Sequence, residues 1–355
     1  MQKKLIALAV AGLVSSGAFA QSNVTISGLL RMSTEQYKIG NSGAASYSAE
    51  TRVSDQSSMI VFSGKEDMGG GNFASFNIDN RFSPDLGAFA AGGNTNVGIG
   101  GAWGTVKMGR QDLHYGTAIE AYKAYTLQNI LSNGIFAQVN GTTVANATRT
   151  PNVLMYDTPM MNGFSARLAY SANAAATEGS GLNDGSKNGA WNLDAKYANG
   201  PLKARYSYWN SKAEGGAAAA LTNQRGDTVD AGYTLPMGLT FGLGWNKSTL
   251  SSDQGASSSR TAWIVPVSYT FGANEVAATY AKAGNTATSN TGAKAYTLAY
   301  SYMLSKRTNT GVSYTNLKND SGASYDLFAI GANGGTNTPT GTSVTQFSWN
   351  LNHAF

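Results

Sequence analysis

The feature that most constrains this chain is a strict alternation of apolar residues with small or polar ones. In residues 239–246, for example, Leu, Phe, Leu and Trp alternate with Thr, Gly, Gly and Asn. Residues 346–355 repeat the pattern, with Phe, Trp, Leu, His and Phe at every second position. A period of two places neighbouring side chains on opposite faces of a β-strand. The pattern recurs along most of the chain, which is therefore predicted to be all-β.

The connections between these segments alternate as well. Short Gly-, Pro- and Asn-rich turns, such as 68–71 and 236–238, are followed by long loops, such as 39–56 and 319–342. This arrangement predicts an up-and-down meander in which both chain ends lie on the short-turn side, where the first and last strands can pair. Sixteen strands are expected, near residues 23–37, 57–67, 72–82, 94–103, 105–111, 151–159, 163–173, 189–198, 202–212, 225–235, 239–249, 260–271, 275–284, 294–303, 308–318 and 343–355.

The systematic difference between short turns and long loops favours a membrane barrel. In such a barrel the apolar face meets lipid, the lumen is polar, and the periplasmic turns are shorter than the outer loops. Because lipid offers no hydrogen-bond partners to the backbone, the sheet must close, and sixteen strands leave a water-filled lumen. The prediction is a 16-stranded antiparallel transmembrane β-barrel in the outer membrane. A soluble sandwich or solenoid is the alternative.

The first twenty residues are predicted to be a signal peptide. Lys3 and Lys4 precede an apolar run over 5–14, and Ala18, Phe19 and Ala20 close it. A membrane anchor is the alternative, but the run has about half the length that crosses a bilayer. Residues 21–355 then form the barrel. Because residues 1–20 contain two lysines and no acid, the formal net charge falls from +5 to +3 on their removal.

Composition argues against most chemistry. The 355 residues include no cysteine and only two histidines, His114 and His353, so no catalytic site, metal site or cofactor is predicted. No basic block points to nucleic acid. An outer-membrane hydrolase remains the enzymatic alternative, and an adhesin the structural one. Moderately long, low-complexity loops disfavour the adhesin.

The longest connection, residues 112–150, is predicted to fold inward as a constriction loop. Connections of this length in a compact barrel are usually functional or disordered. It contains apolar side chains that can pack against the inner wall, including Tyr115, Ile119, Tyr122, Tyr125, Leu127, Ile130 and Phe136. A surface loop with solvated charges is the alternative.

Charged residues on the inner face are the candidate determinants of permeation, because fixed charges set electrostatic barriers in a narrow aqueous path. With the apolar residues facing outward, the predicted pore-lining set is Arg31, Arg81, Lys107, Arg110, Asp112, Glu120, Arg149, Arg167 and Arg205. Arg110 lies at a strand end where the alternation does not fix its direction. Arginines opposite Asp112 and Glu120 would create a transverse field, with a weak preference for anions.

Four segments also resemble the general porins of β-proteobacteria, in the same order along the chain. They are Lys65-Glu-Asp-Met-Gly-Gly-Gly71, Trp103-Gly-Thr-Val-Lys-Met-Gly-Arg-Gln111, Arg149-Thr-Pro-Asn-Val-Leu-Met-Tyr-Asp-Thr-Pro159 and the terminal Asn352-His-Ala-Phe355. The resemblance covers essentially the whole of residues 21–355. It implies a homotrimeric outer-membrane channel for passive diffusion of ions and small hydrophilic solutes, surrounded by lipid and lipopolysaccharide, with its third outer loop in the lumen.

The resemblance also bears on two details. A lumen arginine that is usual in the resembled family is replaced here by Met59, and the arginine expected within 93–99 is absent. The lumen wall therefore carries fewer basic residues in this chain. A terminal Phe such as Phe355 is implied to be the signal read by the barrel assembly machinery. Phe355 could equally be an aromatic residue at the membrane interface.

Overall fold

The computed structural model describes residues 23–40, 48–89, 92–114, 135, 138–140, 142–143, 149–174, 187–214, 223–327 and 338–355. Residues 1–20, expected to be the signal peptide, lie outside this part of the chain. Within the described ranges, no helix is both long and apolar enough to cross a membrane.

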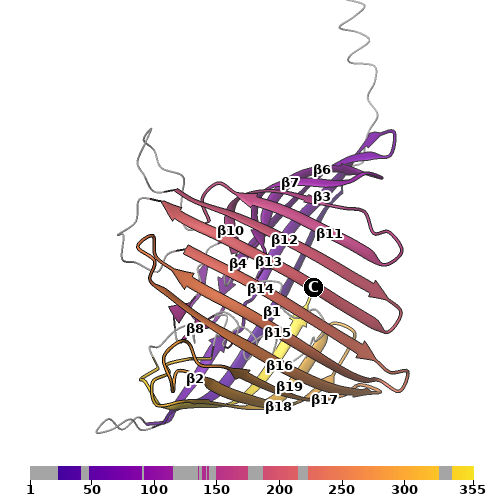
Figure 1. Ribbon diagram of the computed structural model, residues 1–355. Coiled ribbons are helices and arrows are strands. Elements are labelled where there is room, and N and C mark those ends of the chain that lie inside the picture. The colour runs from indigo at the N-terminus through magenta and orange to yellow at the C-terminus, as the bar shows by residue number, and fades with distance from the viewer. Residues whose placement is uncertain are drawn as a thin grey trace, which may run out of the picture.

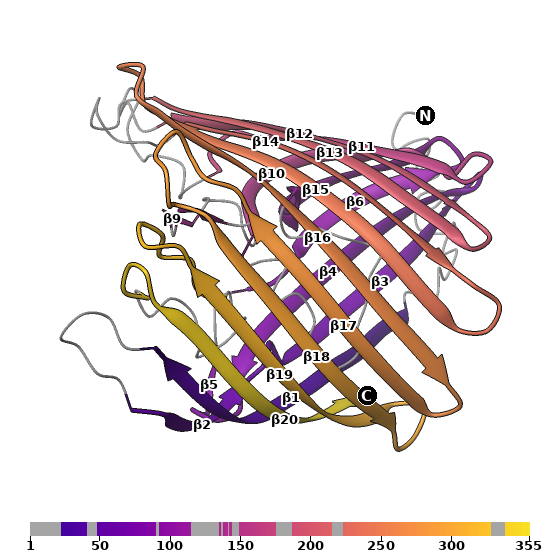
Figure 2. The ribbon, with the colours of Figure 1, turned by 60° about the horizontal axis from the view of Figure 1, so that its bottom comes forward.

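The chain folds into one closed antiparallel sheet whose strands run obliquely around the barrel (Figures 1 and 2). Its first eight ring strands are β1 (Asn23–Ile39), β3 (Met59–Gly69), β4 (Asn72–Ser83), β6 (Thr95–Gly101), β7 (Gly104–Asp112), β10 (Arg149–Asp157), β11 (Phe164–Ser171) and β12 (Lys187–Asn199). The second eight are β13 (Leu202–Glu214), β14 (Asn223–Thr234), β15 (Leu239–Ser251), β16 (Ser257–Phe271), β17 (Asn274–Ala283), β18 (Ala293–Met303), β19 (Thr308–Asn319) and β20 (Ser343–Ala354). The predicted sixteen-stranded barrel is confirmed.

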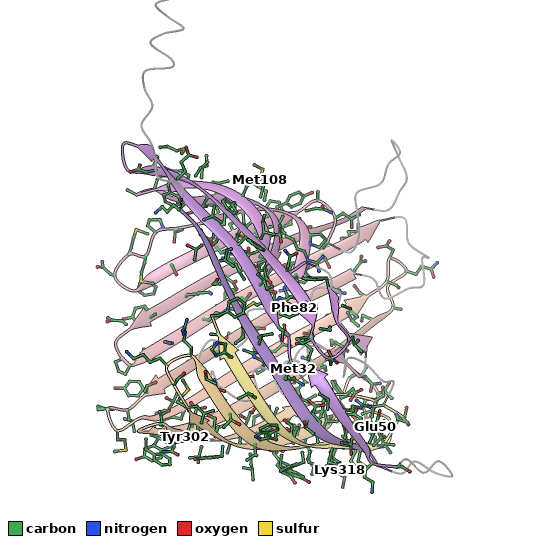
Figure 3. All side chains as sticks on the ribbon, turned by 180° about the vertical axis from the view of Figure 1, so that it is seen from behind. Met32, Glu50, Phe82, Met108, Tyr302 and Lys318 are labelled. Carbon is green, nitrogen blue, oxygen red and sulfur yellow. The ribbon has the colours of Figure 1, made fainter. Side chains whose placement is uncertain are left out.

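The ring closes between its first and last strands, as the two chain ends on the short-turn side predicted. β1 pairs with β20 over eleven residue pairs, from Leu29 with Ala354 to Ile39 with Val344. Figure 3 shows these two strands side by side, far apart in sequence but adjacent in the wall. Closure leaves no free edge in this ring, as a sheet in lipid requires.

The two faces of the wall differ as the alternation predicted. Outward side chains such as Leu243, Trp245 and Phe347 are exposed, whereas inward ones such as Asn246 and Ser248 are buried. The outer face is therefore apolar and the inner face mainly polar, the pattern of a barrel that carries water inside.

Four short strands lie outside the predicted sixteen. β2 (Glu50–Asp55) occupies part of the connection predicted as a loop over 39–56 and pairs with the outer half of β1, while β5 (Ala88–Phe89) pairs with the end of β4. β8 (Gln138–Val139) and β9 (Thr142–Thr143) form a separate ribbon within the 112–150 connection. The loop prediction for 50–55 was wrong because hydrogen bonding to the extended β1 stabilises a segment that has little alternation of its own.

Candidate functional site

Charged side chains gather where β1, β4, β7 and β10 approach one another. We name Arg31, Arg81, Arg110 and Arg149 the arginine wall. The charge of Arg81 lies close enough to act on both Arg31 and Arg149, and that of Arg110 acts on Arg149. The structure thus brings together four of the predicted pore-lining residues from four different strands.

A local irregularity between β2 and β3 positions the first two arginines. Ser57 has a φ of 73°, and the Asp55 carboxylate accepts the backbone N–H groups of Ser57 and Ser58 at 3.0 and 2.8 Å. Arg31 donates its backbone N–H to Ser58 Oγ at 3.0 Å, and the Arg81 guanidinium donates to the Ser57 carbonyl at 3.3 Å. The turn therefore ties β1 and β4 together at the height of the two guanidinium groups.

Acidic groups accompany these arginines. Arg81 Nη2 lies 2.8 Å from Asp79 Oδ2, and Arg149 Nε lies 3.7 Å from Asp112 Oδ1. Asn94 connects the two acids, because its backbone N–H reaches Asp79 at 3.3 Å and its side-chain amide reaches Asp112 at 2.9 Å. The acids are held in fixed positions beside the arginines.

Arg110 follows a backbone distortion at the start of the predicted constriction loop. Gly109 has a φ of 142°, and a Cβ there would come within 2.2 Å of the Thr95 carbonyl oxygen, so only glycine fits. Opposite it, the pairing of β10 with β7 shifts between Thr150 and Val153. Arg110 makes no ion pair among the described residues, and its Nε is buried without a hydrogen-bond partner there.

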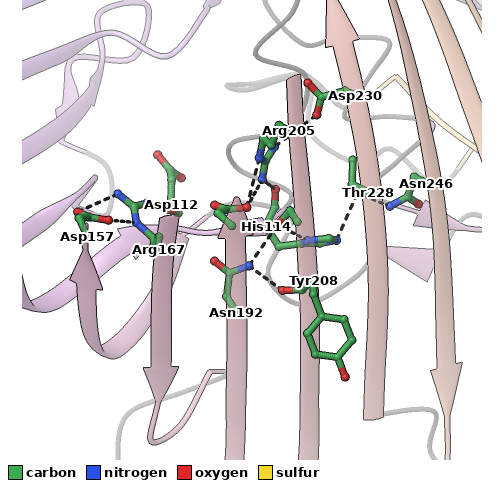
Figure 4. A network of polar contacts seen from close by, with 12 residues as sticks. Asp112, His114, Asp157, Arg167, Asn192, Arg205, Tyr208, Thr228, Asp230 and Asn246 are labelled. Carbon is green, nitrogen blue, oxygen red and sulfur yellow. Dashed lines mark hydrogen bonds and ion pairs between the residues drawn. The ribbon is translucent and has the colours of Figure 1, made fainter. Parts of the chain in front are cut away.

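A second charged group lies further along the same wall. The Asp157 carboxylate binds Arg167 Nε at 2.6 Å (Figure 4). It also binds Lys107 Nζ at 3.3 Å. Arg167 also reaches the Asp112 backbone carbonyl at 3.4 Å. This contact connects the second group to the start of the loop at 112–150.

The first residues of that loop turn onto the inner wall of β13 and β14. His114 is fully buried, with Nδ1 at 2.8 Å from Ser207 Oγ and Nε2 at 3.5 Å from Thr228 Oγ1 (Figure 4). Its backbone carbonyl accepts a hydrogen bond from Arg205 at 2.9 Å. Burial, and secondarily the charge of Arg205, lowers the pKa of His114 to about 3, so the ring is neutral at pH 7.

Arg205 differs from the other predicted pore-lining residues. Its side chain is 1% exposed, lies 2.9 Å from Asp194 and 3.9 Å from Asp230, and is covered by the His114 segment. It faces inward as the alternation predicted, but in this position it anchors the loop, and the described structure gives water little access to it.

The Ser207–His114 pair lacks the features of a hydrolase site. A serine nucleophile needs a substrate-accessible hydroxyl and a base oriented by an acid on its second ring nitrogen. Here both side chains are 0% exposed, and the second ring nitrogen of His114 faces Thr228. No cluster of metal-ligating side chains occurs in the part of the chain that the structure describes.

The middle of the 112–150 connection contacts the opposite wall where it is described. Ile135 is fully buried, and its carbonyl accepts a hydrogen bond from Arg260 of β16 at 2.8 Å. β8 contacts β15 and β16. Glu120, Lys123 and the apolar residues from Tyr115 to Ile130, with Phe136, lie outside the described residues.

Two buried apolar clusters on the inner wall, which contact these loops, were not predicted from the sequence. Leu113 packs in a buried cluster with Val153, Met155 and Trp209, and Ile135 packs in another with inward alanines of β16, β17 and β18. The sequence did contain a signal for these clusters, because it places apolar residues at inward positions, where a water-filled lumen favours polar ones. Ala323, Tyr325 and Leu327 also belong to the cluster of Ile135, although they lie in the last long connection, for which no inward fold was expected.

Phe355 lies just beyond β20. Its backbone exchanges two hydrogen bonds with Gly28 of β1, at 3.0 and 3.1 Å. Its ring covers Gly28 so closely that a Cβ there would meet Phe355 Cζ at 2.3 Å.

Comparison with known proteins agrees with this architecture. The Gram-negative porin family matches residues 7–322. An outer membrane porin protein of Bordetella pertussis is 25% identical over 87% of this chain and 92% of its own length. Among solved structures, the anion-selective porin from Comamonas acidovorans has a TM-score of 0.79 at 24% identity, covering 94% of this chain and 100% of that one. A trimer form of OmpT from Vibrio cholerae has a TM-score of 0.64 at 13% identity, covering 94% and 99%.

The family match spans most of the chain, and the fold is the closed barrel with an apolar outside and a polar inside that such a match requires. The chain belongs to the Gram-negative porin family and forms a diffusion channel in the outer membrane.

Proposed function

We propose that this channel passes small hydrophilic solutes with a weak preference for anions, and that the arginine wall carries this preference. The supporting observation is its charge surplus: within the part of the chain that the structure describes, four arginines stand against three nearby acids, Asp55, Asp79 and Asp112. An excess of fixed positive charge beside a narrow aqueous path attracts anions and repels cations.

Two further observations support a weak preference. Lys107 and Arg167 outnumber Asp157, their shared partner, by one charge. By contrast, Arg205 is matched by Asp194 and Asp230, and Met59 occupies the wall beside Arg81 in the β3–β4 register. The relative from Comamonas acidovorans is described as anion-selective. The surplus here is small, so the expected selectivity is modest.

Replacing Arg31 with glutamine tests this proposal. Arg31 belongs to neither of the ion pairs of Arg81 and Arg149, so the substitution removes wall charge and leaves both pairs in place. We expect the anion-to-cation permeability ratio to fall roughly twofold, because a unit charge about 4 Å from an ion in water contributes about 1 kcal/mol and salt screens part of it. The measurement is the reversal potential of single channels in a salt gradient.

Arg225→Gln is the matched control. It makes the same change in charge, but Arg225 is exposed on the outer face beside Asp227. It should leave the reversal potential unchanged. A cation-selective wild-type channel, or equal shifts in the two variants, would show that the arginine wall does not set selectivity.

We further propose a homotrimer that associates through the outer faces of β1, β3, β4, β6 and β7. These strands present no outward Tyr or Trp, whereas later strands present many, such as Trp191, Trp245 and Trp263. Aromatic residues of this kind are typical of membrane interfaces, so the later strands suit contact with lipid and lipopolysaccharide. Outward Thr34, Gln36 and Asn80 suit a protein contact better than lipid.

We also propose that the protein is not an enzyme, that residues 1–20 are a cleaved signal peptide, and that the barrel assembly machinery recognises Phe355. The buried Ser207–His114 pair supports the first statement and the sequence pattern supports the other two. Mass spectrometry of the outer-membrane protein should find Gln21 at its N-terminus.

A further inference from the structure

The last long connection folds back into the mouth of the barrel. Loops normally lie at the surface, yet Ala323, Tyr325 and Leu327 are 0–1% exposed. The side chain of Asn319, at the end of β19, bridges both arms of this connection. It donates to the carbonyls of Tyr325 and Thr342 at 2.8 and 3.1 Å and accepts from the Tyr325 N–H at 2.8 Å. We name residues 319–327 the outer clamp.

The inner wall under the outer clamp presents small apolar side chains against which the clamp packs. Five inward alanines, Ala262, Ala281, Ala283, Ala293 and Ala295, make a shallow apolar area on β16, β17 and β18. Each is at most 4% exposed, although alanine on the wall of an open, water-filled lumen would be wet. Ile135 of the 112–150 connection and Tyr325 and Leu327 of the clamp complete this cluster.

A side-chain hydrogen bond joins the clamp to the first strand. Tyr37 of β1 donates its hydroxyl to Asp326 Oδ1 at 3.0 Å, and both residues are buried. The guanidinium of Arg52 in β2 lies 4.3 Å from the centre of the Tyr37 ring. β1, β2 and the outer clamp therefore meet at Tyr37.

The clamp also contacts the 112–150 connection directly. Ser324 Oγ donates to the Asn140 carbonyl at 3.4 Å, and Ile135 is held from the wall side by the hydrogen bond from Arg260. Ile135 and Asn140 of this connection therefore contact the outer clamp, and Ile135 and β8 contact the barrel wall.

We propose that the outer clamp is a positioning element for Ile135 and Asn140 of the 112–150 connection, and that the Tyr37–Asp326 hydrogen bond holds the clamp against these residues and thereby limits the width of the outer half of the channel. This inference rests on the channel function of the chain. Tyr37 and Asp326 are positioning residues, since they act through the loop they hold.

Three substitutions test the fastening. Tyr37→Phe removes only the hydroxyl, and Asp326→Ala removes its acceptor. Both should raise single-channel conductance by roughly a third or more and increase current noise, because the narrowest cross-section limits flow. Both should also admit larger neutral sugars in liposome swelling. Asp326→Asn keeps a side-chain oxygen that can still accept from the Tyr37 hydroxyl, so it should behave as wild type.

The control is Tyr302→Phe, which removes a hydroxyl from the outer face. Heat-modifiable migration on gels verifies that every variant forms a barrel. The proposal is overturned if Tyr37→Phe and Asp326→Ala conduct like wild type with the same size limit. A wild-type protein that does not conduct at all would instead contradict the channel function, so the two failures are distinguishable.

A cross-link supplies a second, independent test. The chain contains no cysteine, so Asn140→Cys and Ser324→Cys introduce the only two thiols. In the Tyr37→Phe background, joining them with a short bifunctional thiol reagent should restore wild-type conductance and noise. The same reagent on the single Ser324→Cys variant should change nothing. Efficient cross-linking without restored conductance would overturn the proposal.

Discussion

At the scale of single residues, His114 shows how partners distant in sequence decide a side chain's role. In the sequence it lies in a long connection with no evident Ser or Asp partner. Its partners, Ser207, Thr228 and Arg205, come from strands about a hundred residues later. The burial that results keeps the ring neutral and makes it an anchor for the start of the loop.

The anchor is expected to weaken in acid. A solvated histidine takes up a proton near pH 6.5, whereas the pKa of buried His114 is about 3. The released loop therefore binds more protons than the anchored one, and anchoring loses about 1.4 kcal/mol for each pH unit across this window. Arg205 and Asp230 face the same site, and Asp194 partly favours the proton. Current noise of the wild-type channel should increase as the pH falls from 6.5 towards 3.

His114→Gln isolates this effect, because the amide can still bond Ser207 and does not titrate. Its noise should stay flat across the same pH range. His353→Gln is the control, since His353 lies on the outward phase of β20 and bonds Thr308 at 2.9 Å. If His114→Gln keeps the full acid response, another group produces it.

The face of the sheet on which a side chain lies could be predicted from the sequence, but the side chains that it contacts could not. Alternation places Arg31, Lys107 and Arg205 on the inner face. Which acid each one meets depends on strand stagger and on the loops. Lys107 of β7 and Arg167 of β11 both bind Asp157, which lies on β10 between these two strands. Arg205 is covered by the segment that follows β7. No spacing within one strand contains that information.

At the scale of elements, the ring strands were predictable because lipid on one side and water on the other impose the alternation on each of them. All sixteen fall within three residues of their expected ends. β2 and the outer clamp were not predictable in this way. β2 is stabilised by its pairing with β1, although most of its side chains are exposed. The outer clamp is stabilised by burial within the mouth, where the period-two pattern is lost.

The end of β20 allows packing and recognition to be separated. Gly28→Ala displaces the Phe355 ring and presses on the Met59 carbonyl, because a Cβ there lies 2.3 Å from Phe355 Cζ and 2.7 Å from the Met59 carbonyl oxygen, but it keeps the terminal residue. Deletion of Phe355 removes both the ring and the terminus. If the assembly machinery reads Phe355, we expect the deletion to reduce barrel in the outer membrane severalfold and Gly28→Ala to leave most of it.

Both variants should then refold in detergent, where no assembly machinery is present, and gel migration of heated and unheated samples measures the folded fraction. Equal losses for the two variants in cells would favour packing alone. Normal amounts of the deleted protein in the outer membrane would contradict recognition of Phe355.

At the scale of the whole molecule, the outer surface divides into two sectors. The aromatic-rich wall of the later strands suits lipid. The strands of the opposite sector, from β1 to β7, present no outward Tyr or Trp, although Trp103 is exposed in the turn between β6 and β7. This sector includes polar Asn80, whose amide would be poorly satisfied in hydrocarbon. A subunit contact would shield that amide and explain the division.

Asn80→Trp tests whether this sector is the trimer interface. A bulky ring in a packed contact should cost about 1–3 kcal/mol at each interface, so the trimer should dissociate at a lower temperature while each barrel still folds and conducts. Ala278→Trp, on the outward phase of β17 between Val276 and Tyr280, adds the same ring to the aromatic sector and should leave the trimer intact. Oligomeric state is measured by native mass spectrometry and by gel migration on heating. If only Ala278→Trp dissociates the trimer, the interface lies in the aromatic sector instead. A monomeric wild-type protein would contradict the trimer itself.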